Sequence, residues 1–169
     1  MAAPKTSVDM SVETNREIAG RLGVAWREIR RGAASNALRH LIFESEEFAI
    51  EPGQMDTLEK LVMHETMRMG ELADAMKVDP STATRAVQKL IKDGLAERVA
   101  HGGDARVVVV GPTERGREVF LHVVERRRHL VLLVLEQFAE DEREKVAEIL
   151  ERFSAAVDTA VNELSQQQH

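Results

Sequence analysis

Residues 69–94 read MGELADAMKVDPSTATRAVQKLIKDG, and this stretch decides the fold that the sequence predicts. Apolar residues recur at helical spacing at its start: Met69, Leu72, Ala73 and Met76. After the link KVDP, Asp79 and Pro80 favour the start of a second helix, because aspartate accepts hydrogen bonds from free amides and proline fits the first helical position. Gly94 is typical of a helix end. The stretch therefore predicts a helix-turn-helix.

The second helix, STATRAVQKLIKD, has two chemically different faces. At about 100° per residue, one face gathers Ala83, Ala86, Val87, Leu90 and Ile91. The other gathers Ser81, Thr82, Thr84, Arg85, Gln88, Lys89 and Lys92. Hydroxyls near a helix N-terminus can approach phosphates, and Arg, Lys and Gln carry donors that match base edges in the major groove. Every surface helix has a polar face, but a short preceding helix and a tight link are typical of a recognition helix. The DNA contacts expected here are Ser81, Thr82, Thr84, Arg85, Gln88 and Lys89.

A hairpin follows, with strands expected at residues 95–100 and 106–110 and the tip HGGDA between them. Gly102 and Gly103 permit a tight turn, and the valines after Arg106 are good strand formers. Arg106 beside the tip could enter a minor groove next to the site of the helix, with Asp104 orienting its guanidinium. Alternatively, Asp104 and Arg106 form a surface salt bridge of little energetic value. After a helix-turn-helix, we interpret the hairpin as a DNA-binding wing.

Helical patterns extend on both sides of this lobe. Apolar residues at helical spacing from Ile18 to Ile42 predict one long helix or two in series, and Pro52 begins another helix in PGQMDTLEKLVMH. After the hairpin, GPTERGREV begins a long helix to about Phe138. Thr113 caps it imperfectly, because Gly116 stands where a capping box has glutamate.

The last helix, expected from about Glu140 to Leu164, repeats apolar residues at a spacing near 3.5, which suits a helix–helix seam. The terminal helices have no lobe of their own, so we expect them to pair with a second copy of the chain. The predicted fold is mainly α with a small β-hairpin. A disordered tail (1–11) precedes a winged helix-turn-helix lobe (52–112), which is inserted between N- and C-terminal dimerisation helices (12–51 plus 113–169).

Composition narrows the function further. The chain has 169 residues, a net charge of −6 and no cysteine. Absence of cysteine excludes thiolate zinc sites and cysteine nucleophiles. Residues 81–106 nevertheless carry five Lys and Arg against three Asp and Glu, so any contact with a polyanion is local. The sequence has no transmembrane run and no signal peptide, which favours a cytoplasmic protein without a membrane partner. It also lacks a phosphate-binding loop and paired carboxylates in an apolar setting, so we do not expect an enzyme.

The stretch RMGELADAMKVDPSTATRAVQKLIKDGLAERVAHGGDARVVVVGPTERG, residues 68–116, resembles the MarR (multiple antibiotic resistance regulator) family of transcription factors. VDPSTATR, GLAER, the wing Asp-x-Arg and PTERG follow one another in the family's order. The resemblance implies a homodimeric regulator, usually a repressor, whose recognition helices enter successive major grooves of a pseudo-palindromic operator. It places Ser81, Thr82, Thr84, Arg85 and Lys89 among the family's recognition-helix contacts, and Asp104 with Arg106 in its wing.

The chain departs from the family pattern in two regions. Gly70 stands where many members have a hydroxyl residue, and the wing has Ala105 where members often carry a second arginine. One cation per wing predicts a weaker or more salt-sensitive minor-groove contact.

The resemblance also implies control by a small aromatic or phenolic anion. Trp26 and Arg30 lie one helical turn apart, and a stacking surface beside a cation suits an aromatic carboxylate. A lone tryptophan at helical spacing is also a common core residue. The histidines show no pair at i, i+4 spacing, although His40 and Glu44 have it, so we expect surface or core histidines and no metal site or cofactor. The alternative function is a helical dimeric protein-interaction module whose winged helix no longer binds DNA.

Overall fold

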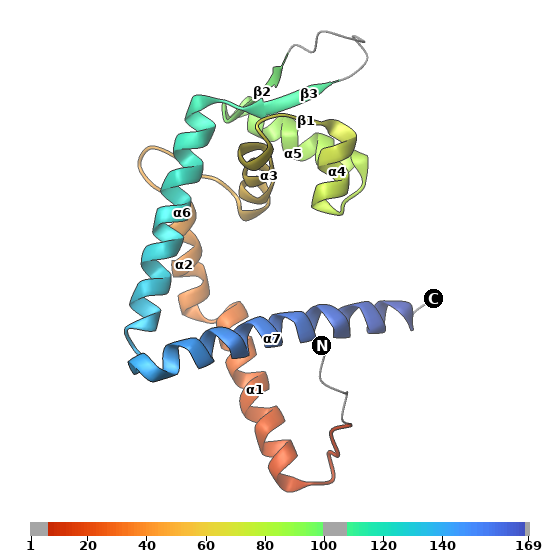
Figure 1. The fold of residues 1–169 in the computed structure, drawn as a ribbon, viewed down its shortest axis with the longest axis vertical. Helices are drawn as coiled ribbons and strands as arrows, with labels where there is room; N and C mark the ends of the chain where they lie inside the picture. The colour runs from red at the N-terminus through yellow and green to blue at the C-terminus, as the bar shows by residue number, and fades with distance from the viewer. Residues whose placement is uncertain (1–6, 100–107, 168–169) are drawn as a thin grey trace. The chain divides into compact units, whose positions relative to one another are not determined.

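A computed structural model of the chain describes residues 7–99 and 108–167, and helices make up most of it (Figure 1). The elements in chain order are α1 (Glu13–Arg31), α2 (Ala33–Phe43), α3 (Pro52–His64), β1 (Met67–Arg68), α4 (Met69–Met76), α5 (Pro80–Lys92), β2 (Ala96–Val99), β3 (Val109–Pro112), α6 (Glu114–Leu135) and α7 (Glu140–Gln166). The chain divides into two compact units between Val123 and Val124. The predicted fold class, mainly helical with a small antiparallel sheet, is confirmed.

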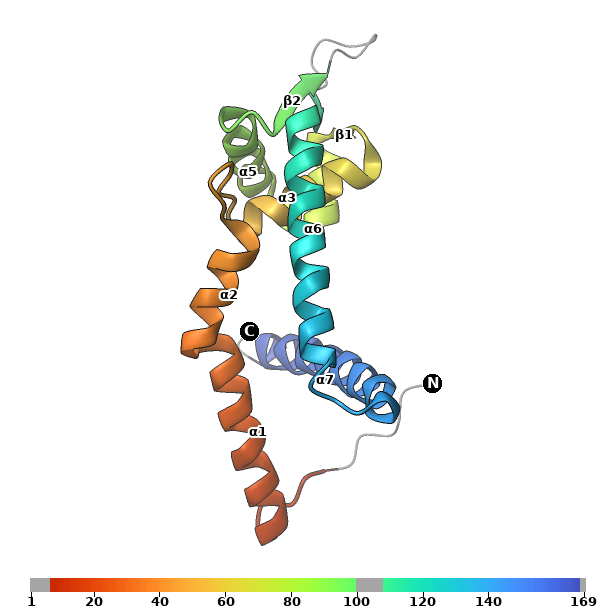
Figure 2. The ribbon, with the colours of Figure 1, turned by 90° about the vertical axis from the view of Figure 1, so that its left-hand side faces the viewer.

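The N-terminal helical pattern is resolved as two helices in series, α1 and α2 (Figure 2). Gly32 separates them in an extended conformation, with φ −64° and ψ 164°. A Cβ at this position would lie 2.4 Å from the carbonyl oxygen of Glu28, so glycine allows the chain to turn closely against the end of α1. Helix α1 begins at Glu13, earlier than the apolar pattern from Ile18 indicated, and its apolar residues stay exposed.

Helices α3, α4 and α5 pack with a three-stranded antiparallel sheet of order β1-β3-β2 (Figure 1). The core takes fully buried side chains from every layer: Met55, Leu58 and Leu61 of α3, Leu72 of α4, Leu90 of α5, Val110 of β3 and Val123 of α6. Burying a side chain of this size contributes on the order of 1.5–3 kcal/mol. Because these contacts join elements far apart in sequence, the helix-turn-helix is held rigidly on the lobe.

The sheet corrects two expectations. The second hairpin strand was expected at residues 106–110. Residues 106 and 107 lie outside the described residues, Val108 is not in the strand, and β3 runs from Val109 to Pro112, where Pro112 lies opposite Ala96. Strand β1 had no signal in the sequence, because two residues are too short for a period-2 pattern. Its residues pair with the first two residues of β3, Met67 with Val110 and Arg68 with Val109.

The start of α6 is one residue later than Thr113, which is its cap. The Thr113 hydroxyl accepts a hydrogen bond from the Gly116 amide at 3.0 Å and donates to the Gly94 carbonyl at 2.7 Å. Gly116 replaces the expected glutamate for a steric reason: a Cβ there would lie 2.0 Å from the Leu95 carbonyl oxygen. The imperfect capping box therefore reflects close packing of α6 on the turn after α5.

Helix α6 ends at Leu135, before the expected Phe138, and α7 runs from Glu140 to Gln166. The amides of Gln137 and Phe138 bond back to Val134 and Leu135, which forms a tight turn between the two helices. Within residues 7–99 and 108–167, none of the helices has the length and apolar character needed to cross a membrane.

Candidate nucleic-acid interface

Helix α5 begins at a well-formed cap on Asp79. One carboxylate oxygen accepts from the Ser81 amide and hydroxyl at 2.9 and 2.5 Å and from the Thr82 amide at 3.0 Å. The other accepts from the Thr82 hydroxyl at 2.6 Å. These hydrogen bonds hold the pKa of Asp79 well below its usual range, and the bond from the Ser81 hydroxyl has the largest effect. The predicted N-cap and first helical position are confirmed, and the cap is fully ionised at neutral pH.

The same cap decides what the hydroxyls can do. The Ser81 and Thr82 protons are donated to Asp79, and the Thr84 hydroxyl donates to the Pro80 carbonyl at 2.7 Å. A hydroxyl that donates within the protein keeps lone pairs that accept hydrogen bonds. In this arrangement the three side chains can accept from exocyclic amino groups of bases, whereas donation to phosphate falls to the lysines and arginine.

The two faces of α5 match the sequence interpretation. Ala83, Val87 and Leu90 are buried, and Ala86 and Ile91 are half-buried. All seven polar residues of the opposite face are exposed: Ser81, Thr82, Thr84, Arg85, Gln88, Lys89 and Lys92. The helix thus presents one continuous polar surface whose charged side chains are all basic.

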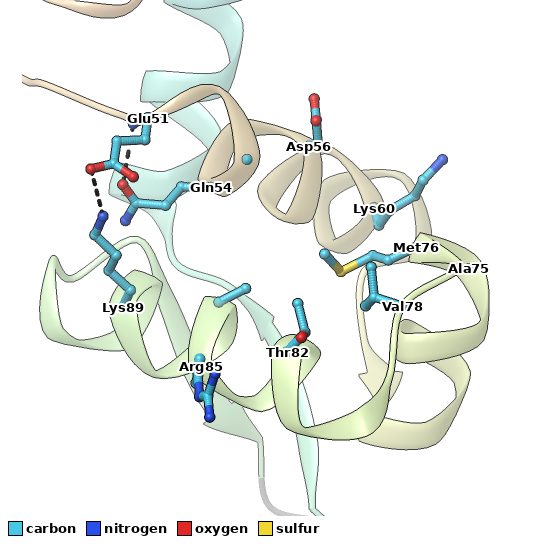
Figure 3. A pocket seen from close by; sticks show the side chains of 12 residues that line it. Glu51, Gln54, Asp56, Lys60, Ala75, Met76, Val78, Thr82, Arg85 and Lys89 are labelled. Atoms are coloured by element: carbon cyan, nitrogen blue, oxygen red, sulfur yellow. Dashed lines mark hydrogen bonds and ion pairs between the residues drawn. The ribbon is translucent and has the colours of Figure 1, made fainter. Parts of the chain in front are cut away.

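The cations on this surface differ in their surroundings. Among the described residues, Arg85 and Lys92 have no ion-pair partner, whereas Lys89 Nζ lies 2.8 Å from Glu51 Oε1. A groove of about 580 Å³ separates α5 from α3, with Met76, Val78 and Ala86 among its lining residues. Figure 3 shows Lys89 reaching to Glu51 beside this groove, while Arg85 points away from it. Arg85 is therefore placed to meet a ligand outside the lobe, whereas Lys89 is engaged by Glu51.

Contacts at the C-terminal end fix the position of α5. Gly94 adopts φ 71°, a left-handed conformation that favours glycine, and the Leu95 amide bonds to the Leu90 carbonyl at 2.8 Å. Gln54 of α3 donates to the Asp93 carboxylate at 2.8 Å, although Gln54 is only 5% exposed. Sequence reasoning missed Gln54; a polar residue among the apolar positions of α3 was the one available signal.

The wing residues Asp104 and Arg106 and the tip glycines lie outside the described residues. The strands that lead to them are described: Arg98 lies opposite Val110, and Val99 opposite Val109, in antiparallel register. The hairpin interpretation is therefore supported at its base, and the roles of Asp104 and Arg106 stay predictions.

The candidate effector residues Trp26 and Arg30 both lie on α1 and are exposed, Trp26 by 37%. Their role as a ligand site stays a prediction. The His40 and Glu44 pair forms a contact of 2.7 Å, and the His122 ring stacks on Phe48 with centroids 6.0 Å apart. In the part of the chain that the structure describes, three potential metal ligands do not gather anywhere.

Fold and site together define a winged helix-turn-helix protein, and comparison with known proteins agrees. Residues 50–108 match the model of the MarR family. The helix-turn-helix transcriptional repressor MdtR of Bacillus subtilis (strain 168) is 27% identical over 114 residues, which are 68% of this chain and 74% of MdtR. The crystal structure of RV1404 from Mycobacterium tuberculosis has 29% identity and a TM-score of 0.67, over 92% of this chain and 98% of RV1404.

Streptococcus pneumoniae FabT, solved in complex with DNA, has the same fold at 17% identity, with a TM-score of 0.67 over 86% of this chain and 98% of FabT. The chain therefore belongs to the MarR family, and its class is that of winged helix-turn-helix transcriptional regulators. The resemblance stated from residues 68–116 is confirmed.

Proposed function

We propose that this protein is a homodimeric, sequence-specific DNA-binding regulator that represses transcription from pseudo-palindromic operators. The observation that carries the proposal is α5: a capped helix, anchored at both ends, whose exposed face has only basic charged side chains. Two such helices in a dimer would enter successive major grooves. The name of MdtR supports the repressor role, because that relative is a repressor.

The proposed contacts divide by chemistry. Arg85 and Gln88 carry donors that match guanine and adenine edges, so they read bases. Ser81, Thr82 and Thr84 approach the bases as acceptors, since their protons bond within the helix. Lys89 contacts phosphate, which contributes affinity without sequence information. Arg106, oriented by Asp104, adds a minor-groove contact from the wing.

Dimerisation is proposed because large apolar side chains of the terminal helices are exposed in the described residues. The exposed large apolar residues of the terminal helices are Ile18, Leu22, Val24, Trp26 and Ile29 of α1, Leu121, Val124, Val131, Leu132, Leu133 and Val134 of α6, and Ile149, Leu150, Val161 and Leu164 of α7. Large apolar side chains that stay exposed on each of these helices indicate an interaction site. A second copy of the chain would cover it and would bring two recognition helices to one operator.

A small aromatic or phenolic anion is proposed as the effector that releases DNA. Trp26 and Arg30, one turn apart on α1, supply a stacking face and a cation. Salicylate titration followed by Trp26 fluorescence tests the site, with Arg30→Ala as the variant expected to weaken the response. Quenching that is equal in both proteins would remove this pair from the proposal.

The test of the central proposal is selection of bound fragments from random duplex DNA, followed by affinity measurements over a salt series. We expect enrichment of an inverted repeat and a log K that falls steeply with log salt. A protein that selects no sequence and binds no duplex would instead be the interaction module that the composition also permits. The exposed, basic face of α5 favours the regulator.

A further inference from the structure

Glu51, the residue before α3, is the one acidic side chain within the described residues that forms an ion pair with the polar face of α5. Its carboxylate lies 2.8 Å from Lys89 Nζ, and both side chains are accessible, Glu51 by 61% and Lys89 by 45%. The hydrogen bond from Lys89 is the main cause that lowers the pKa of Glu51, so the carboxylate is charged at neutral pH. Arg39 and Asp93 are the other charged groups that act on Glu51, with opposite signs.

The position of Glu51 is set by the lobe itself. Its backbone amide donates to Gln54 Oε1 at 3.2 Å, and the same Gln54 amide group donates to Asp93 at the end of α5 at 2.8 Å. Gln54 is buried, so this bridge holds the start of α3 against the C-terminal half of α5. These hydrogen bonds fix the backbone at Glu51 close to α5, and this places the Glu51 side chain beside Lys89.

A lysine ammonium is a compact charge that a carboxylate and a phosphate would both attract. Resting on the proposed DNA-binding function, we infer that Glu51 is an affinity-setting residue, an intramolecular competitor that occupies Lys89 in place of a DNA phosphate. Lys89 contacts a phosphate only after its ion pair with Glu51 breaks. The unpaired Glu51 carboxylate then faces the negatively charged DNA. The pair carries no net charge, so Lys89 adds little to the salt dependence of binding while Glu51 is present.

The experiment compares four full-length proteins on one selected operator: wild type, Glu51→Gln, Lys89→Ala and the double variant. Affinity is measured by fluorescence anisotropy at several salt concentrations. Glutamine keeps the backbone bond to Gln54 and removes the charge. Glu118→Gln is the matched control, because it removes an exposed carboxylate from the same unit without a partner on α5 among the described residues. Thermal unfolding verifies that all variants are folded.

We expect Glu51→Gln to bind about threefold more tightly per subunit, which lies within the range for an exposed ion pair, and hence about tenfold more tightly as a dimer. The salt slope of log K should steepen by about 2 per dimer. In the Lys89→Ala background, the same substitution should change affinity less than about twofold. Glu118→Gln should behave as wild type.

Two results would overturn the inference while leaving the regulator intact. The first is that the wild type binds its operator and Glu51→Gln increases the affinity no more than Glu118→Gln does. The second is an equal gain with and without Lys89, which would show a long-range charge effect and no competition. Failure of the wild type to bind any duplex would overturn the proposed function itself, and this inference with it.

Discussion

At the scale of single residues, Gly116 shows how one missing side chain joins two parts of the fold. We predict that Gly116→Ala destabilises the protein by about 1–3 kcal/mol, the usual cost of overpacking. The new Cβ would lie 2.0 Å from the Leu95 carbonyl oxygen, which is backbone and cannot rotate away. This cost exceeds the gain of up to about 1 kcal/mol that alanine brings to a helix.

Urea unfolding checks this prediction, with Gly70→Ala as the matched control. A Cβ at Gly70 would meet nothing within 4 Å, so that variant should be as stable as wild type or more stable. Equal stability of the two alanine variants would contradict the packing explanation for Gly116.

A second prediction at the scale of single residues concerns Asp79 and the pH dependence of stability. Its folded pKa is lowered by the Ser81 and Thr82 bonds, so its ionisation stabilises the fold above the unfolded pKa of about 3.9. That stabilisation is lost as the pH falls below this value toward the folded pKa. We expect Asp79→Asn, which keeps an acceptor without the charge, to melt at a lower temperature than wild type at pH 7 and by a smaller margin at pH 3.

Melting curves at the two pH values are the measurement. Asp74→Asn on α4 is the control, because no described side-chain hydrogen bond depends on its carboxylate. A difference between Asp79→Asn and wild type that stayed constant with pH would show that the charge of the cap is irrelevant to stability.

At the scale of elements, α5 separates base readout from phosphate contact along one helix. We predict that Arg85→Ala costs about 1–3 kcal/mol of binding free energy on the preferred operator and relaxes preference at particular base pairs. Lys92→Ala, near the helix end, should weaken all sequences about equally and reduce the salt slope by about 1 per subunit.

A randomised operator library measures both effects at once. Arg85 and Lys92 are comparable in the structure, because both are exposed and neither has an ion-pair partner among the described residues. If the two variants lost affinity uniformly across the library, Arg85 would be a phosphate contact and its base-reading role would be wrong.

At the scale of the whole molecule, the exposed apolar side chains of the terminal helices predict an obligate homodimer. Removing residues 140–169 should abolish the dimer and tight operator binding, because a single half-site forgoes half the contacts. Ile149→Glu with Leu164→Glu tests the same surface in the full chain, since these side chains are 61% and 60% exposed and can be replaced without disturbing the core.

Light scattering reports the mass of each protein, and Glu151→Gln on the same helix is the control expected to remain dimeric. Wild-type protein that is folded and monomeric at micromolar concentration would contradict the prediction. If the Ile149→Glu, Leu164→Glu variant were still dimeric, the dimer interface would not include this surface of α7.

The sequence by itself determined the helices that make the recognition unit. Helix α4 spans Met69–Met76 as the apolar spacing indicated, and α5 begins at Pro80 after the Asp79 cap. These features depend on hydrogen bonds between residues two to four positions apart, so their signals are complete within a short window. The polar and apolar faces of α5 follow from the same periodicity.

Only the tertiary structure decided the rest. The shift of β3 to Val109–Pro112 and the existence of β1 depend on pairing between strands, which a short strand's own residues do not specify. The bridge of Gln54 to Asp93, the pair of Glu51 with Lys89 and the need for glycine at 116 each join residues distant in the chain. Local residue patterns do not record which distant groups will meet, because packing of the whole lobe brings them together.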